Sequence, residues 1–168
     1  MFTDGASDRV VDVFLGDFVM CHRVPLDGPA FAWKEHPSLD LVELTLTKLQ
    51  IVESNPKDLN DVAGLLAVHE LGDGPEQLDA GRLARSLASD WGLWRTDTAN
   101  LDRLASAASE GQLPGGAGRT VGERAAELRG WIDRAGKSMR WRARAKVGER
   151  VSWYDTPEEP ESAWAQVR

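Results

Sequence analysis

The chain has 168 residues, of which 42% are apolar and 28% are charged, and its formal net charge is -7. This length and balance are typical of a globular domain with a sizeable core and argue against a disordered chain. One cysteine, Cys21, excludes an intramolecular disulfide, and no apolar run is long enough to span a bilayer. The opening residues lack a charged-then-apolar leader, so we expect a cytoplasmic protein without membrane association.

Two apolar segments near the start, after a small and polar lead, are predicted to be strands. Residues 9–15 are rich in β-branched and apolar side chains, with the carboxylate of Asp12 among them. Residues 16–17 are typical of a turn, and residues 18–24 are again apolar, so the two segments predict an antiparallel hairpin. Residues 25–38 contain three prolines and are predicted to form a loop.

The rest of the chain is predicted to be mainly helical. From Val42 onward, apolar residues recur at spacings of three and four, which is the period of an α-helix. Asn55 before a proline, Asp79, and Thr120 with Glu123 in capping-box spacing mark three helix starts. The predicted helices span residues 42–54, 56–71, 80–89, 91–108, 120–135 and 137–149, with a glycine-rich linker at 111–118.

These elements predict an α+β fold, in which a small N-terminal antiparallel strand hairpin is followed by five or six α-helices. We expect one unit at residues 8–72, a helical domain at 76–150, and a loosely ordered tail at 151–168, which holds prolines and clustered acids. An isolated hairpin is marginal in water and exposes strand edges. It must therefore pack on the helices or pair with a second chain, which indicates a homodimer through the strand edge as one outcome.

Asp12 is the first candidate for a functional side chain. A carboxylate among apolar strand residues must find a partner, a metal ion or an open cleft. Rigid carboxylates of this kind bind Mg²⁺ in metal-dependent phosphoryl transfer. The alternative is that Asp12 faces solvent on the polar side of an edge strand, and both interpretations stay open.

A second candidate is a cluster of lysines and acids on the first two predicted helices. Lys48 has a long stem that can reach a phosphate, and Lys57, Asp58 and Asp61 lie at the start of the next helix. Asp58 and Asp61 share a helix face because they are three residues apart. The alternative is that the acids stabilise the helix macrodipole and that Lys57 and Asp61 form an ordinary surface pair.

A third candidate is the basic segment near the end of the chain. Residues 119–150 hold ten Lys or Arg against four Asp or Glu, although the whole chain is acidic. Arg140, Arg142 and Arg144 surround Trp141, and arginine beside an aromatic ring can bind RNA. The alternative is that Trp141 seats the helix while the arginines neutralise the acidic body.

Two motifs in spaced order resemble a known family. The TKLQ of residues 47–50, followed by the KDLNDV of residues 57–62, resembles the paired C-terminal motifs of nucleotidyltransferases of the AbiEii toxin kind, known from toxin–antitoxin systems. The VDVF of residues 11–14 is similar to the later strand of that family. Residues 8–72 would then be a partial nucleotidyltransferase-like segment, and the hairpin a remnant of the nucleotidyltransferase sheet.

The resemblance implies an activity and residue roles. The family transfers NMP from an NTP to a nucleic-acid or protein hydroxyl with Mg²⁺. By resemblance, Asp12 is the third metal carboxylate and a catalytic residue, and Lys48 contacts the nucleotide phosphates. Lys57 is a further substrate-binding residue, and Asp58 and Asp61 are organisers of the pocket or catalytic acids.

The chain departs from the family at its beginning. AbiEii-type enzymes carry a Gly-Ser turn and an Asp-x-Asp strand before the third acid, and residues 1–11 contain neither. Either the protein begins further upstream, or this chain is a degenerate relative that binds without catalysing. We therefore expect an enzyme that is incomplete or inactive as this chain, and the alternative is a non-catalytic nucleotide- or protein-binding helical module.

Overall fold

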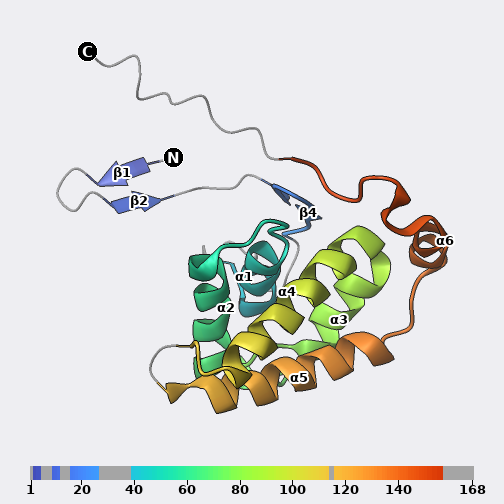
Figure 1. Ribbon diagram of the computed structural model, residues 1–168. Coiled ribbons are helices and arrows are strands. Elements are labelled where there is room, and N and C mark those ends of the chain that lie inside the picture. The colour runs from blue at the N-terminus through green and yellow to red at the C-terminus, as the bar shows by residue number, and fades with distance from the viewer. Residues whose placement is uncertain (1, 5–8, 12–15, 27–38, 114–115, 157–168) are drawn as a thin grey trace.

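The computed structural model describes residues 2–4, 9–11, 16–26, 39–113 and 116–156 (Figure 1). Within these ranges, two short strand hairpins and six α-helices are present. The strands are β1 (Phe2–Asp4), β2 (Arg9–Val11), β3 (Phe18–Val19) and β4 (Arg23–Val24). The helices are α1 (Leu41–Leu49), α2 (Pro56–Val68), α3 (Ala80–Ser89), α4 (Trp91–Ser109), α5 (Gly118–Arg134) and α6 (Met139–Val147), followed by the 3-10 helix η3 (Gly148–Arg150). The expected α+β class, with an N-terminal antiparallel hairpin before the helices, is confirmed.

The strands pair differently from the sequence prediction. β2 pairs with β1, which lies in the polar lead, and the segment 18–24 folds back on itself so that β3 pairs with β4. The reason is a tertiary contact, which the local pattern of polar and apolar residues does not reveal. Cys21 and His22 are buried, and the His22 backbone N–H donates to Gln50 Oε1 at 2.7 Å. These residues therefore turn inward instead of continuing an extended strand.

Two helix starts carry the caps that the sequence predicts. Asn55 Oδ1 accepts hydrogen bonds from the backbone N–H groups of Lys57 and Asp58, and Pro56 occupies the first turn of α2. Asp79 Oδ1 accepts from the backbone of Arg82 at the start of α3. These bonds satisfy amide groups that have no partner inside the helix, which is why Asn and Asp favour this position.

Several helix boundaries differ from the prediction: α2 ends at Val68 instead of residue 71, and α6 spans Met139–Val147 instead of residues 137–149. α5 begins at Gly118 without a side-chain cap, so the capping box predicted at Thr120 is wrong. α1 ends at Leu49 instead of near residue 54. There the Asn100 side chain donates to the carbonyls of Leu49 and Ile51, and this replaces the hydrogen bonds of a further helical turn.

One hydrophobic core joins β4 with the five helices α1 to α5. It includes the fully buried Leu66 of α2 and Leu128 of α5, which lie on opposite sides of the division expected at residues 72–76. α6 contributes no buried residue and packs on the side of the helical body (Figure 1). In the described part of the chain, no helix combines the length and apolar character that crossing a membrane requires. The homodimer through the strand edge stays a prediction.

Candidate functional site

Lys48 of α1 and Asp61 of α2 meet across the two helices. Lys48 Nζ lies 2.7 Å from Asp61 Oδ2, and the side chains are 36% and 38% exposed. The two residues are separated by 13 positions in the sequence. The fold thus brings the two halves of the sequence motif together at a place that solvent can reach.

Asp58 and Lys57 do not take part in the ion pair of Lys48 with Asp61. Asp58 Oδ2 accepts a hydrogen bond from the Asn55 backbone N–H at 2.9 Å, which closes a capping box at the start of α2. Lys57 is exposed, and its side chain makes no ion pair within the described residues. The surface pair of Lys57 with Asp61 is therefore not formed, because Asp61 is engaged by Lys48 instead.

Asp12 lies outside the described residues, so its predicted role as a metal ligand and catalytic acid stays a prediction. Among the residues that the structure describes, no group of three His, Cys, Asp or Glu side chains could hold a metal ion. Asp58 serves the capping box and Asp61 pairs with Lys48. The predicted Mg²⁺ site, which depends on Asp12, therefore stays a prediction.

A buried polar network fixes the connection between α1 and α2. Asn100 of α4 is 3% exposed, and its Oδ1 accepts a hydrogen bond from Ser54 Oγ at 2.8 Å. Arg103 donates to Ser54 Oγ at 2.5 Å and to the Ser54 carbonyl at 3.0 Å. Together with the bonds from Asn100 to the end of α1, these contacts hold Lys48 and Asp61 in their relative positions. The sequence signal for the network is weak, because Asn100 and Arg103 are only two of several polar residues on α4.

A cavity of about 660 Å³ lies at a different place in the molecule, between β4, α3, α4, α6 and the segment after η3. This volume is in the range of small-molecule sites in proteins. The residues that matter below are Cys21, His22, Asp90, Trp91, Arg140, Trp141, Arg144, Trp153, Tyr154 and Asp155. Among them, the sequence indicates only the arginines and Trp141 as functional candidates, because the segments around residues 21, 90 and 153 come together only in the folded chain.

His22 is the most buried polar residue of this cavity, with 7% exposure. Its Nε2 lies 2.8 Å from Thr96 Oγ1, which also accepts a hydrogen bond from Trp153 Nε1 at 3.2 Å. The Thr96 hydroxyl can then donate to Nε2 if the imidazole is neutral with its proton on Nδ1. Desolvation by burial lowers the pKa of His22, while the nearby Asp90 and Asp155 act in the opposite direction. His22 Nδ1 makes no hydrogen bond within the described residues.

Arg144 is engaged by the protein itself. Its guanidinium donates to the carbonyls of Gly148 at 2.6 Å and Val151 at 2.8 Å. The same group lies 4.8 Å above the ring of Trp91. Arg144 thus ties the segment after α6 to the start of α4, and this structural role competes with the predicted contact to RNA.

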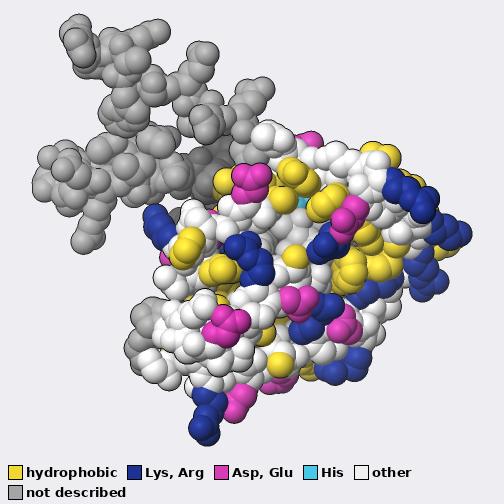
Figure 2. Space-filling view, in the orientation of Figure 1, with side chains coloured by type: hydrophobic (Ala, Val, Ile, Leu, Met, Phe, Trp, Pro, Cys, Tyr) yellow, Lys and Arg dark blue, Asp and Glu magenta, His cyan; other side chains and the backbone are white. Residues whose placement is uncertain are grey.

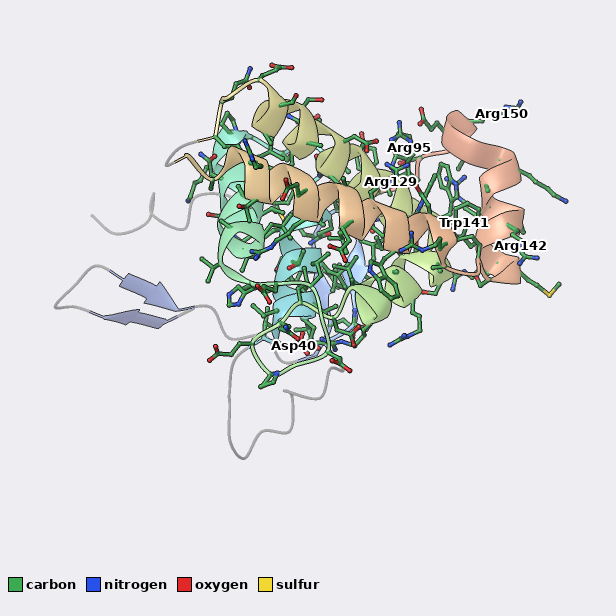
Figure 3. The ribbon with its side chains drawn as sticks, turned by 90° about the horizontal axis from the view of Figure 1, so that it is seen from below. Asp40, Arg95, Arg129, Trp141, Arg142 and Arg150 are labelled. Atoms are coloured by element: carbon green, nitrogen blue, oxygen red, sulfur yellow. The ribbon has the colours of Figure 1, made fainter. Side chains whose placement is uncertain are left out.

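Trp141 and Arg142 lie on different sides of α6, and Arg140 lines the same cavity as Trp141. The ring of Trp141 packs edge-on against Trp94 at 5.0 Å, which supports a seating role for Trp141, whereas Val147 is 40% exposed. Arg140 and Arg142 are exposed, and neither side chain makes an ion pair in the described part of the chain. Figure 3 shows Trp141 facing the helical body and Arg142 facing outward. These two arginines are therefore accessible to a partner.

Comparison with known protein families, with curated proteins and with solved structures finds no match to this chain. The relation to AbiEii-type nucleotidyltransferases therefore remains an interpretation of the motifs at residues 11–14, 47–50 and 57–62.

Proposed function

We propose that the chain is a nucleotidyltransferase-like protein in which α1 and α2 bind the phosphate groups of an NTP. Lys48 is the main phosphate contact, Lys57 is a second cation near it in the sequence motif, and Asp61 orients Lys48. The proposed reaction is transfer of NMP to a hydroxyl of a nucleic acid or a protein. The observation that carries the proposal is the contact between Lys48 and Asp61.

The geometry of this contact supports phosphate binding. An ammonium group has three N–H donors, and Asp61 takes one of them at 2.7 Å. The other two can donate to phosphate oxygens, because the Lys48 side chain is 36% exposed. A carboxylate that fixes a lysine in place lowers the entropy that ligand binding must otherwise remove.

A second candidate function is a non-catalytic module that binds a nucleotide or a protein. The observation that favours it is the capping box of α2, which gives Asp58 a structural role instead of the catalytic role that the resemblance implies. The two candidates differ in turnover, since only the first predicts a labelled acceptor.

Titration of the protein with each NTP, with and without Mg²⁺, tests the proposal by calorimetry. We expect Lys48→Ala to weaken NTP binding by about tenfold or more, because a charge-assisted hydrogen bond contributes about 1.5–3 kcal/mol. Arg119→Ala removes an exposed cation at the start of α5 and serves as the control, with an expected change within about twofold. The pair of Lys48 and Asp61 is partly exposed, so its loss should cost under about 1 kcal/mol of stability.

Incubation with labelled NTPs and total RNA or protein then separates the two candidates. A labelled acceptor that disappears in Lys48→Ala supports the transferase, and NTP binding without labelling supports the non-catalytic module. Equal NTP affinity for the parent chain and Lys48→Ala would contradict the transferase and a nucleotide-binding module, because both place the phosphates on Lys48, and it would leave only a protein-binding module.

A further inference from the structure

The outer face of α6 is basic. Between residues 137 and 150 there are six Lys or Arg and one acid, Glu149. Arg140, Arg142 and Lys146 are exposed and make no ion pair among the described residues. Figure 2 shows Lys and Arg side chains gathered at this end of the molecule. Since the protein as a whole is acidic, these cations form a local site for an anionic partner.

The cavity beside this face has a different chemistry. Trp91, Trp153 and Tyr154 contribute aromatic rings to its lining. Its hydrogen-bonding groups include the free Nδ1 of His22 and the carboxylate of Asp155, which has no side-chain partner in the described part of the chain. Arginines also line the cavity, and two of them, Arg23 and Arg144, are engaged by Asp17 and by backbone carbonyls. This combination of aromatic rings with donors and acceptors does not single out a phosphate. It suits an uncharged heterocycle with donors and acceptors on its edge.

We propose that α6 and this cavity bind single-stranded nucleic acid, with the phosphates on Arg140, Arg142 and Lys146 and one unstacked base in the cavity. Arg140 joins the two parts, because it belongs to α6 and also lines the cavity. The ring of Tyr154 is the stacking surface. It is half-buried, and its one ring contact among the described residues is an edge-on contact with Trp153 at 5.3 Å.

Two features favour RNA or single-stranded DNA over an acidic protein. Cations on a helix would attract either partner, but the carboxylate side chains of an acidic protein would not stack in an aromatic cavity of about 660 Å³. Stacking of a base on an aromatic ring is the usual way in which proteins hold single strands, because every base has a π-face. The bound nucleic acid would also be the acceptor of NMP, and this role rests on the proposed function. Binding of the nucleic acid to α6 and the cavity does not depend on that function.

The experiment measures binding of a labelled single-stranded RNA of about 12 nucleotides by fluorescence anisotropy, at salt concentrations from about 50 to 200 mM. We expect Arg142→Ala to weaken binding and to reduce the salt dependence by about one counterion. Tyr154→Ala should weaken binding about tenfold with the salt dependence unchanged, because it removes a stacking surface and no charge. Tyr154→Phe keeps the ring and should stay within about twofold of the parent chain.

Arg119→Ala is the matched control for charge. Arg119 is exposed at the N-terminal end of α5, and α6 lies near the other end of that helix (Figure 1). We expect its binding curve to match that of the parent chain, and we expect an RNA duplex of the same sequence to bind more weakly because its bases stay stacked.

Three outcomes overturn the proposal. The first is no RNA binding at the lowest salt, and the second is an equal loss in Arg119→Ala and Arg142→Ala. The third is full binding by Tyr154→Ala together with equal competition by polyglutamate, which would assign the face to an acidic protein. NTP affinity, measured separately on Lys48→Ala, keeps failure of this proposal distinct from failure of the proposed function.

Discussion

Asp97 lies inside α4 with a fully buried side chain, and neither of its carboxyl oxygens has a hydrogen-bond partner among the described residues. Burial raises the pKa of this carboxyl well above its ordinary value of 3.8, and the nearby Asp90 raises it further. The folded protein therefore holds a proton at pH values where the unfolded chain has released it. Stability must fall as the pH rises from about 3.8 toward the folded pKa.

Replacement of Asp97 by asparagine removes this titration while keeping the shape of the side chain. We expect Asp97→Asn to raise the free energy of unfolding at neutral pH by about 1–3 kcal/mol, because no buried acid has to be kept protonated. Urea unfolding, measured at intervals from about pH 4 to about pH 8, tests this expectation. The exposed Asp73→Asn is the control, and a parent chain that is as stable at high pH as at low pH would contradict the prediction.

The sequence predicts the roles of some individual side chains and misses the roles of others. Asn55 and Asp79 are recognised as caps because their partners are two or three residues away. His22 is not recognised, because its partners Gln50 and Thr96 lie 28 and 74 residues further along the chain. Of the candidate site, the sequence could place Lys48 beside the next helix, but it could not tell that Asp58 closes a cap.

Arg144 makes more hydrogen bonds to the segment after α6 than any other side chain, and the ion pair of Arg95 with Glu149 and the bond from the Asp155 N–H to the Cys21 carbonyl also hold it. Arg144 donates to three backbone carbonyls, those of Gly148, Val151 and Ser152. The Trp153 ring contributes one further hydrogen bond to Thr96. Without a forked donor at position 144, several of these carbonyls lose their partner at once.

Replacement of Arg144 by lysine keeps the charge and removes the fork. We expect Arg144→Lys to expose Trp153 and Tyr154 to chymotrypsin and to speed cleavage there about 5- to 10-fold, because each lost hydrogen bond contributes about 1 kcal/mol. Arg142→Lys makes the same chemical change on the exposed face of α6 and should leave the cleavage rate unchanged. Equal rates for the two variants would show that Arg144 does not hold the segment.

Asn100 connects α4 to the end of α1 and the start of α2. We expect Asn100→Ala to lower the free energy of unfolding by about 2–3 kcal/mol, because it leaves buried carbonyls at Leu49 and Ile51 without donors. Thermal or urea unfolding measures the loss. Asn60→Ala, at an exposed position of α2, is the control and should stay within about 0.5 kcal/mol. An equally small change in Asn100→Ala would mean that water replaces the amide.

Helices are predicted better than strands in this chain. Their periodicity and caps are local signals, so α2, α3 and α4 begin at the residues that the sequence indicates. The strands are short, and their pairing depends on which residues the helices bury. The boundary of α1 fails for the same reason, since Asn100 is remote from it in the sequence.

The core of the molecule extends across the division that the sequence suggests near residues 72–76. α5 contacts both α2 and α3, and Val62, Leu83 and Leu128 belong to one cluster. The recognisable sequence motifs end near this point, which suggested a division. Such motifs indicate functional side chains, however, and do not indicate which apolar helix faces pack together. A shared core is the reason to expect the two parts to unfold together.

Hydrogen exchange in mild urea tests this expectation. Peptides from α2 (56–68) and α5 (118–134) should reach the same free energy of opening, within about 1 kcal/mol. Peptides from α6, which has no buried residue, should exchange at lower free energy and serve as the internal comparison. A clear difference between α2 and α5 would instead support two separate units.

Four of the seven tryptophans lie together where α4, α6 and the following segment meet. Trp94 and Trp141 are 5.0 Å apart, and Trp91 lies 6.3 Å from both Trp94 and Trp153. Rings this close exchange excitation energy, so their ultraviolet emission is a property of the group. Three of the four line the cavity. A molecule that enters it will change the colour or yield of the protein's own light, and occupancy of the site can be followed without attaching a dye.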